Sequence, residues 1–195
     1  MNSRRVVVTG VGALTPIGNN LQEYWSALKK GVSGAAPITL FDATNFKTKF
    51  ACEVKNFEVT DFIHKKEARK LDRFSQYAMV VSDEAFEDSG LKKEEIDPEK
   101  AGVIWGSGIG GMKTFFQESA DFGKGNGIPR FNPFFIPKLI SDIPAGHISI
   151  KYNFKGPNFT TVSACASSTN ALIDAFNYIK WGTADLFIAG GSEAC

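Results

Sequence analysis

The sequence predicts an α/β fold in which helices cover a sheet with parallel strands. Short apolar runs rich in β-branched residues alternate with longer stretches whose apolar residues recur at helical spacing. Glycines follow several of these runs, as is typical where a chain turns at the end of a helix or strand. Because neighbouring parallel strands need a helical crossover between them, this alternation indicates a sheet that contains parallel pairs.

Each element is assigned from its apolar spacing and from the turn residues beside it. The expected strands are residues 5–11, 51–54, 101–105, 159–164 and 185–189. The expected helices run from a cap at Asn20 to Gly31, over residues 65–89 with Gly90 as the stop, through Phe115 and Phe116, over 138–151 and over 167–181. We expect Pro144 and Gly146 to disturb the fourth helix, and residues 34–49 and 122–137 to be irregular.

Composition favours one sizeable core and excludes several classes of protein. The chain has 195 residues, 43% of them hydrophobic, and a net charge of +1 at pH 7. A nearly neutral chain lacks a global field for nucleic acid or an acidic membrane, so we expect neither as a partner. No segment has the length of a signal peptide or a membrane span. We expect residues 1–195 to form one domain, and the end directly after an apolar strand suggests that a longer chain has been cut short.

The cysteines do not form a pattern for a disulfide framework or a zinc site. Cys52, Cys165 and Cys195 are odd in number, far apart and without CxxC spacing. We therefore expect no metal and a reduced, cytoplasmic setting.

Cys165 is the strongest candidate for a reactive residue. A β-branched strand leads into Ser163-Ala164-Cys165-Ala166-Ser167, and a helix is expected to begin there. The N–H groups and partial positive charge of a helix N-terminus favour thiolate over thiol, and we expect the Cys165 N–H to donate to an oxyanion. The alternative is that Cys165 is an ordinary small buried residue, as most free cysteines are.

A cysteine nucleophile usually works with a histidine, and neither histidine of this sequence fits that role. His64 stands at the start of a basic helix, and His147 stands in an apolar helical stretch where a histidine is more often part of the core. The residues alone therefore predict only half of a mechanism.

The segment Val8-Thr9-Gly10-Val11-Gly12 has some likeness to a dinucleotide-binding loop. The GxGxxG pattern would require glycine at position 15, where the chain has Thr15 followed by Pro16. No acidic residue closes a second strand to hold a ribose, so we expect no nicotinamide cofactor.

Seven short motifs, in order along almost the whole chain, resemble the β-ketoacyl-acyl carrier protein synthases of the thiolase superfamily, and most closely the elongating type II enzymes. They are residues 5–12 with Thr15-Pro16-Ile17-Gly18, Arg69-Lys70-Leu71-Asp72-Arg73-Phe74, residues 106–111, Asn132-Pro133-Phe134-Phe135-Ile136-Pro137, Gly156-Pro157-Asn158, Ser163-Ala164-Cys165, and Ala189-Gly190-Gly191-Ser192-Glu193. Each motif is weak alone, but the ordered set is specific.

The resemblance implies a five-layered αβαβα sandwich made of two related halves, of which this chain supplies the N-terminal half. It implies that Cys165 accepts an acyl group and that decarboxylated malonyl-carrier then attacks the acyl-enzyme, with no cofactor. Family members have two catalytic histidines, a lysine and a gating phenylalanine in the second half, and His64 and His147 do not match them. A polyketide or aryl-polyene ketosynthase, or a non-catalytic chain-length-factor partner, remains the alternative.

The resemblance also assigns roles to residues outside the turn of Cys165. A basic helix face would bind acidic acyl carrier protein; its residues, at helical spacing, are Lys66, Arg69 and Lys70. The alternative is that these residues form an ordinary solvent-exposed face. Ile109 would line the acyl pocket and limit how far a chain enters, and Phe135, more than Phe134, would reach the pocket of a partner subunit. A homodimer is expected through residues 159–164.

Overall fold

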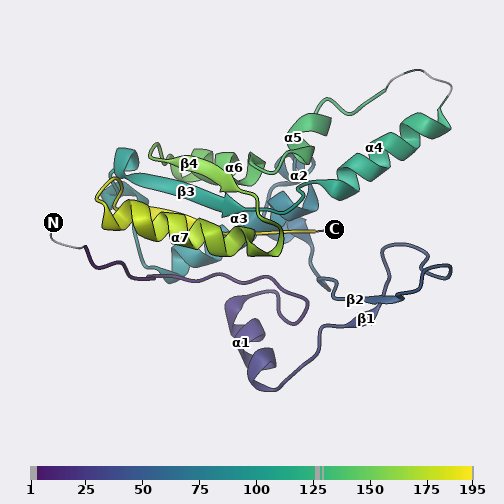
Figure 1. Ribbon diagram of the computed structural model, residues 1–195, viewed down its shortest axis with the longest axis horizontal. Helices are drawn as coiled ribbons and strands as arrows, with labels where there is room; N and C mark the ends of the chain where they lie inside the picture. The colour runs from purple at the N-terminus through teal and green to yellow at the C-terminus, as the bar shows by residue number, and fades with distance from the viewer. Residues whose placement is uncertain (1–3, 126–127, 129, 195) are drawn as a thin grey trace.

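A computed structural model of the protein describes residues 4–125, 128 and 130–194. Helices flank a central sheet, and the α1 region and the β1–β2 hairpin project from it (Figure 1). The strands are β1 Ala36–Pro37, β2 Phe50–Ala51, β3 Ala101–Gly106, β4 Asn158–Thr161 and β5 Leu186–Gly191. The α-helices are α1 Leu21–Lys29, α2 Lys65–Ala68, α3 Arg73–Asp88, α4 Met112–Lys124, α5 Phe135–Leu139, α6 Ile143–Tyr152 and α7 Ser167–Lys180.

The central sheet brings three strand ends to one edge. Within the described residues it consists of β4, β3 and β5 in that order, all parallel. Gly106 at the end of β3 pairs with Thr161 of β4 on one side and with Gly191 of β5 on the other. The strands therefore end level, and the loops that follow them leave the sheet at the same carboxyl edge, where α/β proteins usually bind ligands.

Helices cover both faces of this sheet, as the sequence predicts. Ile104 packs with Ala171 and Ala175 of α7 on one face. Val103 and Trp105 belong to the core on the other face, which includes residues of α3 and α6. All six residues of β3 are buried, because a central parallel strand is covered on both sides.

Two glycines let α7 begin directly on the sheet. A Cβ at Gly106 would lie 2.4 Å from the backbone carbonyl carbon of Ser167, and one at Gly191 would lie 2.6 Å from the Ser168 Cβ. A larger residue at either position would push the first turn of α7 away from the strand ends. This packing fixes the place of the residues immediately before α7.

The prediction of a strand at residues 5–11 is wrong. The segment has no regular secondary structure, no described strand pairs with it, and Val8 is 80% exposed. It is held to α3 instead, since the N–H of Val11 donates to Asp88 (2.9 Å) and that of Ala13 donates to Glu84 (2.8 Å). A β-branched run has a preference for extended backbone, but only a partner strand makes it part of a sheet.

The prediction of a single helix over residues 65–89 is also wrong, because Asp72 caps the start of a second helix, α3. α2 ends at Ala68, and the Asp72 side chain caps α3 by accepting from the N–H of Phe74 (3.3 Å). Asp72 is buried and accepts a second backbone hydrogen bond, from Thr114 (3.2 Å). Apolar spacing continues across this break, so the spacing alone does not reveal it.

Other boundaries differ for local reasons. Pro144 lies in the first turn of α6, one residue after its start at Ile143, where a missing N–H costs nothing, so it does not disturb the helix. α4 and α5 extend into the region expected to be irregular, and the expected strand at 51–54 is the two-residue β2, paired with β1. The cap of α1 at Asn20 and the helix α7 are confirmed. Residues 1–3, 126, 127, 129 and Cys195 lie outside the described residues.

Candidate active site around Cys165

Cys165 lies in the turn between β4 and α7. β4 ends at Thr161, and a short 3-10 turn over Ala164–Ala166 leads into α7, so the expected strand over 159–164 ends earlier. The Cys165 side chain is exposed, so Cys165 is not the buried core cysteine of the alternative interpretation. Its backbone N–H lies in the first turn of helical backbone, where N–H groups lack partners within the helix and an anion is favoured.

The turn that presents Cys165 is strained and is held by Ser167. Ala164 adopts φ of +49°, a left-handed conformation that costs a residue other than glycine about 1–2 kcal/mol. The buried Ser167 hydroxyl donates to the carbonyl of Ala164 (2.7 Å) and accepts from the N–H of Ser163 (2.9 Å). Asn170 donates to the Ser163 hydroxyl (2.6 Å). The sequence pattern does not distinguish Ser167 from its serine neighbours, although serine beside a helix start is a common capping signal.

The loop after β3 runs beside this turn. A Cβ at Gly108 would lie 3.5 Å from the Cα of Ala164, so the two segments are in contact. Gly110 has φ of +81°, and its N–H donates to the Ser107 hydroxyl (3.1 Å). The side chain of Ile109 is 51% exposed. The structure thus brings the loop of Ile109 next to the turn of Cys165.

The residues after β5 complete the same edge. The Glu193 carboxylate accepts from the N–H groups of Gly108 (2.7 Å) and Ile109 (3.0 Å). The Ser192 hydroxyl accepts from the indole N–H of Trp105 (2.9 Å) and donates to the carbonyl of Phe74 (2.8 Å). No local pattern could have revealed these contacts, because they depend on β5 lying next to β3.

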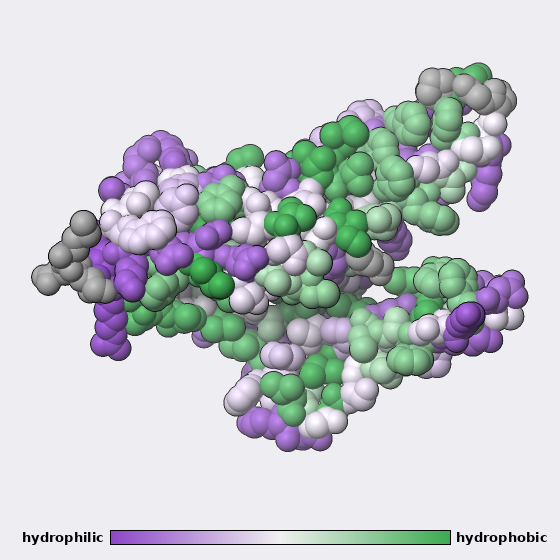
Figure 2. All heavy atoms as spheres, viewed as in Figure 1, coloured by the Kyte–Doolittle hydropathy of each residue, from purple (hydrophilic) through white to green (hydrophobic). Residues whose placement is uncertain are grey.

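Phe135 lies in an aromatic cluster on α4 and α5. Its ring centroid is 5.5 Å from that of Phe131 and 6.4 Å from that of Phe115, in stacked arrangements. Phe134 beside it is 41% exposed. Figure 2 shows apolar residues gathered over α4 and α5. These contacts hold Phe135 against α4 of its own chain.

The three basic residues are not equivalent. α2 ends at Ala68, so Arg69 caps this short helix and Lys70 lies beyond it. Lys66 and Arg69 are exposed, whereas Lys70 forms an ion pair with Glu67 (2.8 Å). The helical spacing therefore applies to Lys66 and Arg69, whereas Lys70 lies beyond the helix and is paired with Glu67.

Both histidines lie on elements other than the loops of Cys165, Ile109 and Glu193. The His64 ring accepts from the N–H of Lys66 (3.3 Å) as the cap of α2. His147 is half-buried in α6, and burial lowers its pKa, so the ring is neutral near pH 7. Glu67 opposes this shift but does not reverse it.

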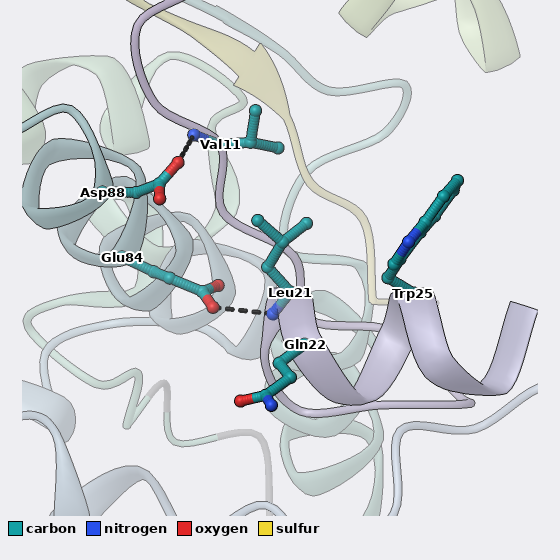
Figure 3. A pocket seen from close by; sticks show the side chains of 6 residues that line it. All are labelled: Val11, Leu21, Gln22, Trp25, Glu84 and Asp88. Carbon is teal, nitrogen blue, oxygen red and sulfur yellow. Dashed lines mark hydrogen bonds between the residues drawn. The ribbon is translucent and has the colours of Figure 1, made fainter.

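A groove of about 480 Å³ between α1 and α3 is separate from these loops (Figure 3). Its carboxylates are already used: Glu84 accepts from the N–H of Leu21 (2.6 Å) and Asp88 from that of Val11. Across the described ranges, no cluster of three or more His, Cys, Asp or Glu could hold a metal ion. No helix in those ranges has the length and apolarity needed to cross a bilayer.

Curated relatives match this chain along its length. It is 46% identical over 195 residues to 3-oxoacyl-[acyl-carrier-protein] synthase 2 of Staphylococcus aureus strain COL, covering 98% of this chain and 46% of the relative. It is 43% identical over 194 residues to the protein of the same name from Synechocystis, covering all of this chain and 46% of the relative. The chain therefore spans about half the length of the curated relatives it matches.

Solved structures agree with the fold. The ishigamide ketosynthase/chain length factor matches with a TM-score of 0.88 at 27% identity, over 99% of this chain and 48% of that one. A type II polyketide ketosynthase in complex with its acyl-carrier protein (AntDE:AntF) matches with a TM-score of 0.84 at 26% identity, over 98% and 52%. The model of the β-ketoacyl synthase N-terminal domain matches residues 3–195. The chain therefore belongs to the β-ketoacyl synthase family, in the N-terminal half of its thiolase-like fold.

Proposed function

We propose that these residues supply the nucleophile of a 3-oxoacyl-[acyl-carrier-protein] synthase of fatty acid elongation. The observation that carries the proposal is the exposed Cys165 in the 3-10 turn that leads into α7, beside the loop of Ile109. The staphylococcal and cyanobacterial relatives carry that name at 43–46% identity. Below, the full-length enzyme means a chain of the relatives' length that contains these 195 residues.

The reaction has two stages at the Cys165 sulfur. Cys165 loses its thiol proton and its sulfur attacks the carbonyl of an acyl-carrier thioester. The bond between that carbonyl carbon and the carrier sulfur then breaks, the carrier leaves as a thiol by taking up the proton from Cys165, and the acyl group stays on Cys165. We propose that the N–H of Cys165 donates to the oxyanion of this step. A malonyl-carrier thioester then loses carbon dioxide, its carbanion attacks the acyl carbon, and the Cys165 thiolate leaves. The product is a 3-oxoacyl thioester two carbons longer.

The second stage needs groups from outside these residues. Loss of carbon dioxide leaves an enolate, which requires nearby donors or positive charge. His64 and His147 belong to α2 and α6 and serve as a helix cap and a half-buried ring. We therefore propose that the 195 residues alone do not catalyse condensation.

The direct test of this function is product analysis. The full-length enzyme, given acyl-carrier and malonyl-carrier thioesters, should release carbon dioxide and one 3-oxoacyl product that is two carbons longer, as read by mass spectrometry. A polyketide synthase would instead add further units to its own unreduced product. Absence of any extended product would contradict the proposal, and repeated extension would favour the polyketide alternative that the ketosynthase neighbours raise.

A non-catalytic, chain-length-factor-like partner is a weaker candidate. Such proteins typically lack the nucleophilic cysteine, whereas Cys165 stands in an exposed turn that buried polar contacts maintain.

We propose that Lys66 and Arg69 dock an acidic acyl carrier protein. Reversing both charges to glutamate should raise the KM for carrier-bound substrates roughly tenfold at low salt, because steering by exposed charges is lost. Added salt should shrink the difference. Small acyl thioesters that lack the carrier should react as before, and reversal at Lys70 should do less because Glu67 already pairs with it.

A matched control is charge reversal at Lys92, which also pairs with a glutamate three residues away, Glu95, but on a different surface segment. It should leave the KM for carrier substrates unchanged. Equal losses with carrier-bound and small substrates in the double variant would indicate a folding defect and contradict the docking role.

We also propose a homodimer formed through β4. Among the described strands β4 pairs only with β3, so its other edge is available, and Val162 just beyond it is 63% exposed. Pairing with a second copy across a two-fold axis would cover this edge and bring Phe134 and Phe135 toward the partner's site. The full-length enzyme should sediment at twice its chain mass at micromolar concentration, and a monomer there would contradict the proposal.

A further inference from the structure

We propose that Glu193 is a positioning residue that fixes the backbone of Ile109 beside Cys165 and thereby sets which acyl chains the site accepts. The inference rests on the proposed function, since it concerns the acyl group that Cys165 would receive. It adds a residue from the loop after β5 to a site otherwise built from the loops after β3 and β4.

The inference rests on two hydrogen bonds that one carboxylate oxygen accepts. Oε2 of Glu193 accepts from the N–H of Gly108 at 2.7 Å and from the N–H of Ile109 at 3.0 Å. Successive N–H groups that converge in this way form a concave anion site, and charge-assisted bonds of this kind are stronger than neutral ones. The carboxylate thus holds the loop at the residue that would limit the pocket.

The other hydrogen bonds of this loop hold the residues on either side of Gly108 and Ile109. The N–H of Ser107 donates to the carbonyl of Thr161 (3.3 Å). The N–H of Gly110 donates to Ser107 (3.1 Å), and the N–H of Gly111 donates to the carbonyl of Leu139 (2.9 Å). The Ile109 side chain is 51% exposed, so packing does little to fix it. The hydrogen bond to its own N–H is therefore the contact that acts on Ile109 directly.

The same contact lies next to the nucleophile's turn. A Cβ placed on Gly108 would be 3.0 Å from Oε2 of Glu193 and 3.5 Å from the Cα of Ala164, the residue before Cys165. The carboxylate, the loop and the turn are consecutive neighbours at the carboxyl edge of the sheet. Releasing the loop would let Ile109 move away from the space beside Cys165, and that movement would admit longer acyl chains and hold short ones less well.

The experiment measures acylation of Cys165 in the full-length enzyme with short and long saturated acyl-carrier thioesters. Glu193→Ala should raise the ratio of long-chain to short-chain rates by about tenfold, because displacements near 1 Å at a reacting centre change rates by one to two orders of magnitude. Glu193→Gln should stay within about threefold of the wild type, since its amide oxygen can accept both hydrogen bonds. Alkylation of Cys165 by iodoacetamide, which does not use the pocket, should change less than about twofold in either variant.

Two further variants separate positioning from general stability. In Ile109→Ala the pocket no longer depends on the isoleucine, so adding Glu193→Ala to it should leave the chain-length ratio unchanged. Glu53→Ala is the matched control: Glu53 accepts from the successive N–H groups of Thr39 (3.0 Å) and Leu40 (3.3 Å), but on the β1–β2 hairpin. It should leave the ratio as in the wild type.

A ratio in Glu193→Ala equal to that of the wild type, or an equal fall in acylation and alkylation at every chain length, would overturn the inference. A wild-type enzyme that leaves Cys165 unacylated would overturn the proposed function and this inference together. The positioning role of Glu193 is supported if the ratio changes in Glu193→Ala, stays near the wild-type value in Glu193→Gln, and alkylation is unchanged in both.

Discussion

Replacing Cys165 with alanine should abolish acyl-enzyme formation in the full-length enzyme. The sulfur is the atom to which the acyl group becomes attached, so the loss should exceed about a thousandfold, as expected when a covalent nucleophile is removed. Cys165→Ser should fail as well, because a hydroxyl at the same position is a far weaker nucleophile near pH 7. Intact-protein mass spectrometry after incubation with acyl-carrier thioester measures the adduct directly.

Cys52 offers the matched control within the same chain. It is also an exposed free cysteine, but it follows β2 in the hairpin region and lies at no helix N-terminus. Cys52→Ala should retain full acylation, and iodoacetamide should label Cys165 faster than Cys52 in the wild type. A Cys165→Ala enzyme that still carries an acyl group would refute the assignment of the nucleophile.

The 195-residue chain alone should not decarboxylate malonyl-carrier thioesters, even with Cys165 intact. Transfer of an acyl group requires a thiolate and an oxyanion site, both of which the turn before α7 can offer, so slow self-acylation is compatible with the structure. Decarboxylation requires stabilisation of an enolate, and neither histidine is on the loops around Cys165. The expected release of carbon dioxide is therefore indistinguishable from the uncatalysed background.

Exposed apolar surface gives a second reason for the same result. Leu172, Ile173 and Phe176 on α7 are 53%, 51% and 44% exposed, while the opposite side of the helix is buried on the sheet. Contiguous apolar surface of this kind promotes association unless another part of the protein covers it. We expect the chain to aggregate when expressed alone and to become soluble with a separately expressed C-terminal half of the family fold.

The assay compares the chain alone, the second half alone and their mixture, with release of labelled carbon dioxide as the readout. Only the mixture should turn over. Turnover by the chain alone would contradict the prediction, and a loss of that turnover in His147→Ala or His64→Ala would then identify the histidine that had been wrongly set aside.

The order of elements and the place of the nucleophile could be predicted from the sequence, because both depend on local features. The strand 101–105 and the helix from residue 167 were recognisable from a buried apolar run and from apolar residues at helical spacing. Cys165 stood out because small residues and a strand-to-helix change surround it. Its position in the turn between a strand and a helix is confirmed, and the family to which its motif belongs is confirmed by the match over residues 3–195.

The sequence by itself thus determined the order in which most strands and helices alternate and which cysteine is the candidate nucleophile. Tertiary structure alone decided whether Val6–Val8 joins a sheet, since an extended run needs a partner strand, and where the helix after Lys65 breaks, since Asp72 also binds Thr114 from α4. It also decided that Glu193 meets Gly108 and Ile109, more than eighty residues earlier. That contact exists because β3 and β5 pair in register and end together at one edge, and such long-range pairing leaves no local pattern in the sequence.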